Sequence, residues 1–150
     1  MNNPQTQNNP PENIDLRMRT LRTLWFALVM SVGMYYVLTL FNGPGENARP
    51  NNTLSLAIIA IGITTVFVSL FIKSKLLSRA IDQRQVGMVQ QAYIVGLAIC
   101  EVPALLGMID HFVTGNPYYY VPLIIAVVGQ LLHFPRREHV EQAAFKRSGF

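Results

Sequence analysis

Four runs of apolar residues, each almost free of charged side chains, dominate this chain of 150 residues. They cover about residues 23–41, 54–72, 88–109 and 118–134. Each run approaches the ~20 residues that a helix needs to cross the hydrocarbon core of a bilayer. Because lipid offers no hydrogen-bond partners to backbone groups, runs of this length and uniformity have to be helical. The sequence therefore predicts an all-α fold, a bundle of four transmembrane helices.

The composition agrees with a membrane protein. Hydrophobic residues make up 51% of the chain and charged residues only 13%, against about a quarter charged residues in an average soluble domain. The charged residues gather in the segments between the apolar runs. At this length we expect one domain. The single cysteine, Cys100, excludes a disulfide within the chain.

Polar segments flank the predicted membrane domain, which covers residues 14–135. Residues 1–13, MNNPQTQNNPPEN, are mostly Asn, Gln and Pro, and they cannot bury enough apolar surface to offset their chain entropy. We expect this N-terminal tail to be disordered. We expect residues 14–22 to form a helix at the membrane surface, and residues 136–150 to form a basic cytoplasmic tail.

The distribution of basic residues predicts the orientation. Eleven of the twelve lysines and arginines lie before the first run, between the second and third, or after the fourth, and Arg49 is the twelfth. Because cytoplasmic segments carry an excess of Lys and Arg, we expect both termini in the cytoplasm. As its location we expect a bacterial inner (plasma) membrane. This topology accounts for the net charge of +4 without a nucleic-acid partner. The expected partners are the lipid bilayer and further copies of the chain or other membrane subunits.

Glu101 lies inside the third apolar run. A charged side chain at mid-membrane costs at least ~2.5 kcal/mol on insertion scales, so an acid at this depth needs a function or a hydrogen-bond partner. Counting residues from the predicted membrane edges places four hydroxyl groups at a similar depth: those of Tyr35, Tyr36, Thr64 and Thr65. We expect the partner among them. Two interpretations stay open, a proton or cation site and an acid whose hydrogen bonds hold helices together.

Small residues and a proline surround this acid. Four of them follow at spacings of four, three and four: Gly96, Cys100, Pro103 and Gly107. This spacing places them on one face of a helix, where small side chains let a neighbouring helix approach closely. We interpret the stripe as a packing surface. Pro103 also removes one helical hydrogen bond, and we expect a kink there.

The other polar residues form no catalytic or metal-binding pattern. Asp110 and His111 are expected at one edge of the membrane and His133 at the other, so the three cannot share a metal ion. The chain also lacks the spacing of zinc ligands, a nucleophile paired with a base, and a glycine-rich phosphate loop. We therefore predict no metal, no cofactor and no enzymatic activity.

One segment of the chain resembles a known protein family. Residues 76–113 read LLSRAIDQRQVGMVQQAYIVGLAICEVPALLGMIDHFV. They are similar to the polar loop and outer helix of the ring-forming c subunit of rotary ATP synthases, F-type or vacuolar-type. The similarity consists of Arg84 and Gln85 in the loop, followed by a helix with Glu101 at mid-span and Pro103 close by. The resemblance implies a hairpin of the second and third runs, an acid that carries the ion, and a loop that meets the rotor stalk.

Three functional hypotheses follow from the sequence. The first is a small non-enzymatic membrane protein that packs in an oligomer or a larger complex, with Glu101 as a polar contact between helices. The second is a component similar to the c subunit that moves protons or cations through Glu101. The third is a small channel or carrier.

Overall fold

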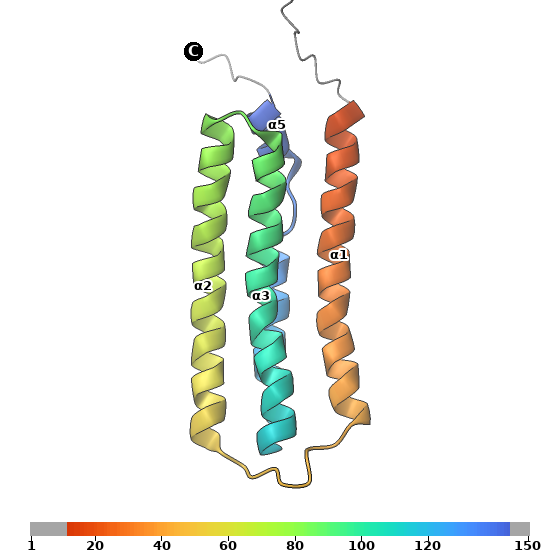
Figure 1. Ribbon diagram of the computed structural model, residues 1–150, viewed down its shortest axis with the longest axis vertical. Coiled ribbons are helices and arrows are strands. Elements are labelled where there is room, and N and C mark those ends of the chain that lie inside the picture. The colour runs from red at the N-terminus through yellow and green to blue at the C-terminus, as the bar shows by residue number, and fades with distance from the viewer. Residues whose placement is uncertain (1–11, 145–150) are drawn as a thin grey trace, which may run out of the picture.

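The described part of the chain folds into five α-helices joined by short connections (Figure 1). The computed structural model describes residues 12–144, and no β-strand occurs within them. In chain order the helices are α1 (Glu12–Phe41), α2 (Asn52–Asp82), α3 (Val86–Thr114), α4 (Tyr120–Leu132) and α5 (Arg137–Ala144). The all-helical fold predicted from the apolar runs is confirmed.

Three of the helices, α1, α2 and α3, are long and apolar enough to cross a membrane. They contain the first three predicted spans. The fourth predicted span, residues 118–134, forms the shorter helix α4 of 13 residues. At 1.5 Å per residue α4 extends for only ~20 Å, less than the ~30 Å of a hydrocarbon core.

The helix α1 begins well before the span predicted within it. Residues 14–22 are helical, as predicted, but they continue directly into that span and form no helix of their own. No proline or glycine lies between Asn13 and Val32 to interrupt the helix. Residues 1–11 of the N-terminal tail and residues 145–150 of the basic tail lie outside the described residues. The first part of the basic tail forms α5.

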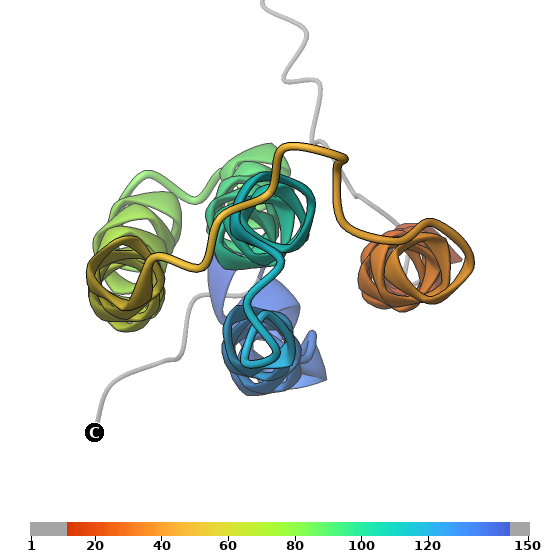
Figure 2. The ribbon, with the colours of Figure 1, turned by 90° about the horizontal axis from the view of Figure 1, so that it is seen from below.

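The central helix of the bundle is α3, which contacts all four others (Figure 2). The helix α2 packs on α3, α4 and α5, and α1 packs on α3, α4 and α5. Within the described part of the chain, α1 and α2 do not pack on each other. Trp25 ties α1 to the end of α4, because its Nε1 donates to the carbonyl oxygen of Gln130 at 2.8 Å. Its ring also stands edge-on to Phe134, with 5.1 Å between centroids.

A tight turn connects α2 to α3. The N–H of Gln85 donates to the carbonyl oxygen of Ala80 at 3.0 Å. The N–H of Arg84 donates to the carbonyl oxygen of Ile81 at 3.2 Å, which completes a Schellman motif. The motif places Arg84 in the left-handed region, with φ of 52°. Glycine is the usual residue there, because a side chain costs ~1 kcal/mol or more in this conformation.

Most of the buried apolar residues form two clusters. The cluster at the α5 end of the bundle consists of Ile14, Met18, Leu21, Leu77, Ala80, Val89, Ala92, Tyr93, Val140 and Ala143. The second lies between α1, α3 and α4 and consists of Val32, Ala104, Leu123 and Ala126. Many large apolar side chains point outward instead, such as Met34 on α1 (60% exposed) and Phe67 on α2 (69%). An apolar outer surface of this extent suits lipid better than water.

The stripe of small residues on α3 is buried. A Cβ added to Gly96 would lie 2.6 Å from Cδ2 of His133, at the end of α4. A Cβ added to Gly107 would lie 2.8 Å from Cδ1 of Leu123. The two glycines therefore let α4 approach α3 closely. The helix continues through Pro103, and the kink expected there stays a prediction.

Candidate functional site: buried polar clusters of the bundle

Glu101 connects α3 to α1 through two hydrogen bonds. Its Oε1 accepts from Oγ of Ser31 at 2.5 Å and from the hydroxyl of Tyr35 at 2.8 Å. Ser31 and Tyr35 are four residues apart, so both hydroxyl groups project from the same face of α1. Among the described residues, Oε2 of Glu101 receives no hydrogen bond from a side chain. The bonds to Oε1 partly compensate for a carboxyl group placed among apolar helices.

The structure separates the four predicted hydroxyl partners. Tyr35 contacts the carboxyl group, whereas the neighbouring Tyr36 is 44% exposed. The hydroxyl groups of Thr64 and Thr65 donate to carbonyl oxygens of their own helix, four residues earlier, at 2.9 and 2.7 Å. Matching by depth did not distinguish these residues, because depth does not fix the face of the helix. Ser31 was missed, although it lies one helical turn before Tyr35.

A second polar cluster, formed by Ser69, Cys100 and His133, joins α2, α3 and the end of α4. All three residues are fully buried. Oγ of Ser69 lies 2.9 Å from Nε2 of His133 and 3.1 Å from Sγ of Cys100. The same Oγ lies 2.8 Å from the carbonyl oxygen of Gly96, so its single hydrogen is shared between this oxygen and Nε2 of His133. Nδ1 of His133 donates to the carbonyl oxygen of Gly129 at 2.7 Å, so the ring is fixed on both sides.

The sequence did not predict this cluster. It placed Cys100 in a packing stripe and His133 alone at a membrane edge. The three residues come from three helices, and Ser69 is separated from His133 by 64 positions. Because none of the three side chains is exposed, the cluster holds the helices together and has no access to a solute in this conformation.

A third cluster lies where α5 folds back on the bundle. The hydroxyl oxygen of Tyr93 accepts the N–H of Arg136 at 3.1 Å and lies 2.6 Å from Nδ1 of His139. Its own hydrogen therefore points to His139. Nζ of Lys73 lies 4.7 Å from the centroid of the Tyr93 ring. Burial, together with the charges of Lys73 and Arg136, lowers the pKa of His139 below its usual 6.5.

A fourth cluster closes the opposite end of the bundle. Asp110 is only 2% exposed, although the sequence placed it at a membrane edge. Its Oδ1 accepts from Oγ of Ser55 at 3.0 Å and from Oγ1 of Thr114 at 2.9 Å. Nδ2 of Asn116 donates to the same Ser55 hydroxyl at 2.8 Å. Nε2 of His111 lies 3.1 Å from a backbone carbonyl oxygen just after α1 and takes no part in this cluster.

The polar clusters are built from hydroxyl, thiol, amide, imidazole, ammonium and single carboxyl groups. Within residues 12–144, no group of three or more His, Cys, Asp or Glu side chains is placed to hold a metal ion. The chemistry that these clusters supply is hydrogen bonding between helices.

Together, the fold and its buried clusters define a small helical protein with three helices of membrane length. Comparison of the chain with models of known protein families, with curated proteins and with solved structures gives no match. The similarity of residues 76–113 to the c subunit therefore stays a prediction from the sequence. The function has to be argued from the clusters themselves.

Proposed function

We propose that the chain is a small non-enzymatic integral membrane protein that packs in an oligomer or a larger membrane complex, with Glu101 as a polar fastener. The proposed location is the bacterial inner membrane, with four crossings and both termini in the cytoplasm. Its partners in this proposal are lipid and further copies of the chain or other membrane subunits. The pair of hydrogen bonds from Ser31 and Tyr35 to Glu101 carries the proposal.

The helix α1 depends on such contacts more than the other long helices do. Only 11% of its most apolar stretch is buried, against 44% in α3. Within this stretch, the contacts of α1 with the rest of the bundle therefore include few close apolar ones. The hydrogen bonds to Glu101 and the bond from Trp25 to Gln130 are directional, so they fix the rotation and register of α1 against α3 and α4. Apolar contacts alone do not fix them, because lipid is as apolar as the helix surface.

The positions of the helix ends support the proposed orientation. The start of α1, the turn between α2 and α3, and α5 lie at one end of the bundle (Figure 1). The α1–α2 loop and the start of α4 lie at the other end. Within residues 12–144, this second end carries a single Lys or Arg, Arg49. The excess of basic residues at the first end is typical of a cytoplasmic side.

The surroundings of α4 support a fourth crossing despite its length. Irregular backbone is tolerated at membrane depth where it is buried against protein. At the last residue of α4, Nζ of Lys73 donates to the carbonyl oxygen of Leu132 at 3.5 Å, and after the helix Tyr93 accepts the N–H of Arg136. Before α4, the side chain of Asn116 accepts the N–H of Tyr118 at 2.9 Å. These contacts extend the hydrogen-bonded segment beyond both ends of the helix.

Two replacements of Glu101 test whether its hydrogen bonds hold α1 to α3. Glu101→Gln keeps an oxygen that accepts both hydroxyl bonds, whereas Glu101→Leu removes the acceptor at similar volume. We expect Leu to lower the free energy of unfolding in detergent micelles by ~1–2 kcal/mol and Gln to lower it by less than half as much. Native mass spectrometry of the same samples tests the assembly. Equal losses for the two variants contradict the proposal.

Ion transport by Glu101 is the second candidate function, and the conformation of Arg84 favours it. Strained backbone of this kind persists where the side chain has a use, and glycine would relieve the strain. In this candidate, Glu101 takes up and releases a proton or cation, as the resemblance of residues 76–113 implies. Its second carboxyl oxygen, to which no described side chain donates a hydrogen bond, is available for that exchange.

Covalent labelling separates the two candidates. A hydrophobic carbodiimide reacts with a protonated carboxyl group that it reaches from lipid. We measure labelling of Glu101 by mass spectrometry from mildly acidic to mildly alkaline pH, with Glu101→Gln as the control. Labelling that falls as the pH rises supports ion exchange. Absence of labelling at every pH supports the fastener.

A further inference from the structure

A basic hollow of about 330 Å³ lies between α1 and α5, at the proposed cytoplasmic end of the bundle. Its lining residues are Asp15, Met18, Arg19, Arg22, Thr23 and Arg137. Five of these six belong to α1 and recur at helical spacing, so one face of α1 forms a wall of the hollow. Arg137, the first residue of α5, forms the other side.

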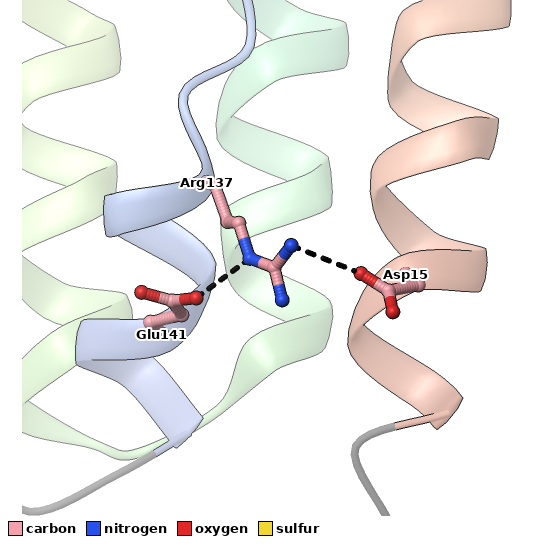
Figure 3. A network of polar contacts seen from close by, with 3 residues as sticks. All are labelled: Asp15, Arg137 and Glu141. Atoms are coloured by element: carbon pink, nitrogen blue, oxygen red, sulfur yellow. Dashed lines mark hydrogen bonds and ion pairs between the residues drawn. The ribbon is translucent and has the colours of Figure 1, made fainter.

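Two carboxylates hold Arg137 in place (Figure 3). Its Nη1 lies 3.3 Å from Oδ1 of Asp15, and its Nε donates to Oε1 of Glu141 at 2.7 Å. The remaining terminal nitrogen, Nη2, has no ion-pair partner among the described residues. A guanidinium group fixed in this way presents its remaining N–H groups in a preset direction.

Arg19 and Arg22 give the hollow a surplus of positive charge. Both side chains are exposed, and no carboxylate of the described residues lies within 4.0 Å of either. They are three residues apart on one helix face, where like charges repel. Three guanidinium groups and the two carboxylates of Asp15 and Glu141 leave a net charge of +1. A bound phosphate group relieves this repulsion, and arginine pairs with phosphate in a bidentate geometry.

An apolar groove of about 450 Å³ follows along the same side of α1. It lies between Val32, Gly33 and Tyr36 of α1 and the α4 side chains from Tyr120 to Val128. Gly33 is eleven residues after Arg22, which is three helical turns, so the two face the same side. They are ~16 Å apart along the axis, about half of a ~30 Å hydrocarbon core. A Cβ at Gly33 would meet no atom within 4 Å, so the groove is open there.

We infer that the basic hollow binds the phosphate of an anionic phospholipid, with one acyl chain following α1 into the apolar groove. Basic pockets between helices on the cytoplasmic side of a membrane suit anionic headgroups. The distance between hollow and groove matches the depth of one leaflet. The inference rests on the proposed membrane orientation, and it identifies the class of lipid that the chain selects.

Trp25 lies along α1 between the residues of the hollow and those of the groove, so its fluorescence can report on the site. It is the single tryptophan of the chain and lies one helical turn after Arg22. Phospholipids with brominated acyl chains quench tryptophan fluorescence on contact. In vesicles, we expect brominated phosphatidylglycerol to quench Trp25 several-fold more efficiently than brominated phosphatidylcholine at the same mole fraction. Equal quenching by the two lipids overturns the inference.

A matched pair of double variants tests the residues. Arg19→Gln with Arg22→Gln removes two charges from the hollow and is expected to abolish the preference for phosphatidylglycerol. Lys75→Gln with Arg79→Gln removes two exposed charges from α2, at the same end of the bundle as the hollow. This variant is expected to keep the preference for phosphatidylglycerol. An equal loss in both variants would show a non-specific effect of net charge and overturn the site. Circular dichroism checks that both variants remain helical.

Two further arms test the acyl chain and the source of the phosphate. Gly33→Leu fills the groove and is expected to reduce quenching by bromines at mid-chain, while the headgroup preference remains. Unchanged quenching overturns the acyl-chain contact.

Inorganic phosphate is added at constant ionic strength to vesicles that contain brominated phosphatidylglycerol. It is expected not to restore the fluorescence of Trp25, and restoration assigns the hollow to a free anion instead. Because this readout is independent of Glu101, loss of the lipid preference leaves the fastener proposal standing, and the reverse also holds.

Discussion

The hydroxyl group of Tyr35 lies 2.8 Å from Oε1 of Glu101, whereas that of Tyr36, the next residue, belongs to an exposed side chain. Successive residues of a helix are about 100° apart around the axis, so only one of two adjacent tyrosines faces α3. The pair therefore provides two variants with the same chemical change at nearly the same depth.

Tyr35→Phe removes one of the two hydrogen bonds that Glu101 accepts from α1. We expect it to lower the free energy of unfolding in detergent micelles by ~0.5–1.5 kcal/mol. Tyr36→Phe removes a hydroxyl group that has no described partner and is expected to change stability by less than ~0.5 kcal/mol. Denaturant titrations followed by circular dichroism measure both. Equal effects of the two variants would show that the bond to Glu101 contributes nothing.

Gly96 and Gly33 both lie inside long helices but differ in the space around them. A Cβ at Gly96 meets His133 at 2.6 Å, and one at Gly33 meets no atom within 4 Å. We expect Gly96→Ala to destabilise the fold by ~1–3 kcal/mol through overpacking. We expect Gly33→Ala to stabilise it by up to ~1 kcal/mol, because alanine is the better helix former. Thermal unfolding of the two variants measures both changes in stability. Stabilisation by Gly96→Ala would contradict the close approach of α4 to α3.

The sequence predicted much of this fold because its strongest signals are local. Apolar runs identified the helices, and the spacing of Gly96, Cys100 and Gly107 identified a face of α3 that is buried. The run at residues 118–134 indicated a fourth span, but composition alone did not show that the helix ends at Leu132.

The buried polar clusters were harder to predict because they depend on which helix faces meet. Ser69 and His133 lie 64 positions apart, and no local pattern relates them. Asp110 read as an ordinary interfacial acid, since its burial depends on how the α3–α4 connection folds over it. Depth along the membrane was available from counting, whereas rotation about each helix axis was not.

Ser69 tests whether its cluster stabilises the bundle. Ser69→Ala leaves Nε2 of His133 without its neighbouring hydroxyl group in a fully buried position, at an expected cost of ~1–3 kcal/mol. Ser74→Ala, at an exposed position of the same helix, is the control and is expected to be nearly neutral. Chemical denaturation of the purified variants gives the comparison. A neutral Ser69→Ala would mean that this hydroxyl group contributes no net stability to the cluster.

The turn between α2 and α3 predicts an unusual gain in stability. Arg84 has a φ of 52°, which glycine adopts without strain. We expect Arg84→Gly to stabilise the protein by ~0.5–1 kcal/mol. Gln83 has a φ of −86°, and Gln83→Gly is expected to destabilise because it only adds freedom to the unfolded chain. If Arg84→Gly destabilises instead, the arginine side chain contributes contacts that outweigh the strain of its backbone.

The contact between Tyr93 and His139 makes the docking of α5 dependent on pH. The Nδ1 atom of His139 accepts from the Tyr93 hydroxyl group only while the ring is neutral. Burial and the charges of Lys73 and Arg136 lower the pKa of His139 below 6.5, although Glu138 opposes this shift. Because the folded pKa lies below that of the unfolded chain, the stabilisation is complete above pH ~6.5. It is lost progressively as the pH falls from there through the lowered folded value.

Hydrogen exchange of residues 137–144, compared between neutral and mildly acidic pH, measures this loss after correction for the intrinsic exchange rate. We expect faster relative exchange of α5 at the acidic pH, while the middle of α3 stays protected. His139→Gln keeps an acceptor for Tyr93 but does not titrate, so its α5 should exchange with the same protection at both pH values. Persistent pH dependence in His139→Gln would assign the effect to another group at the α5 contact.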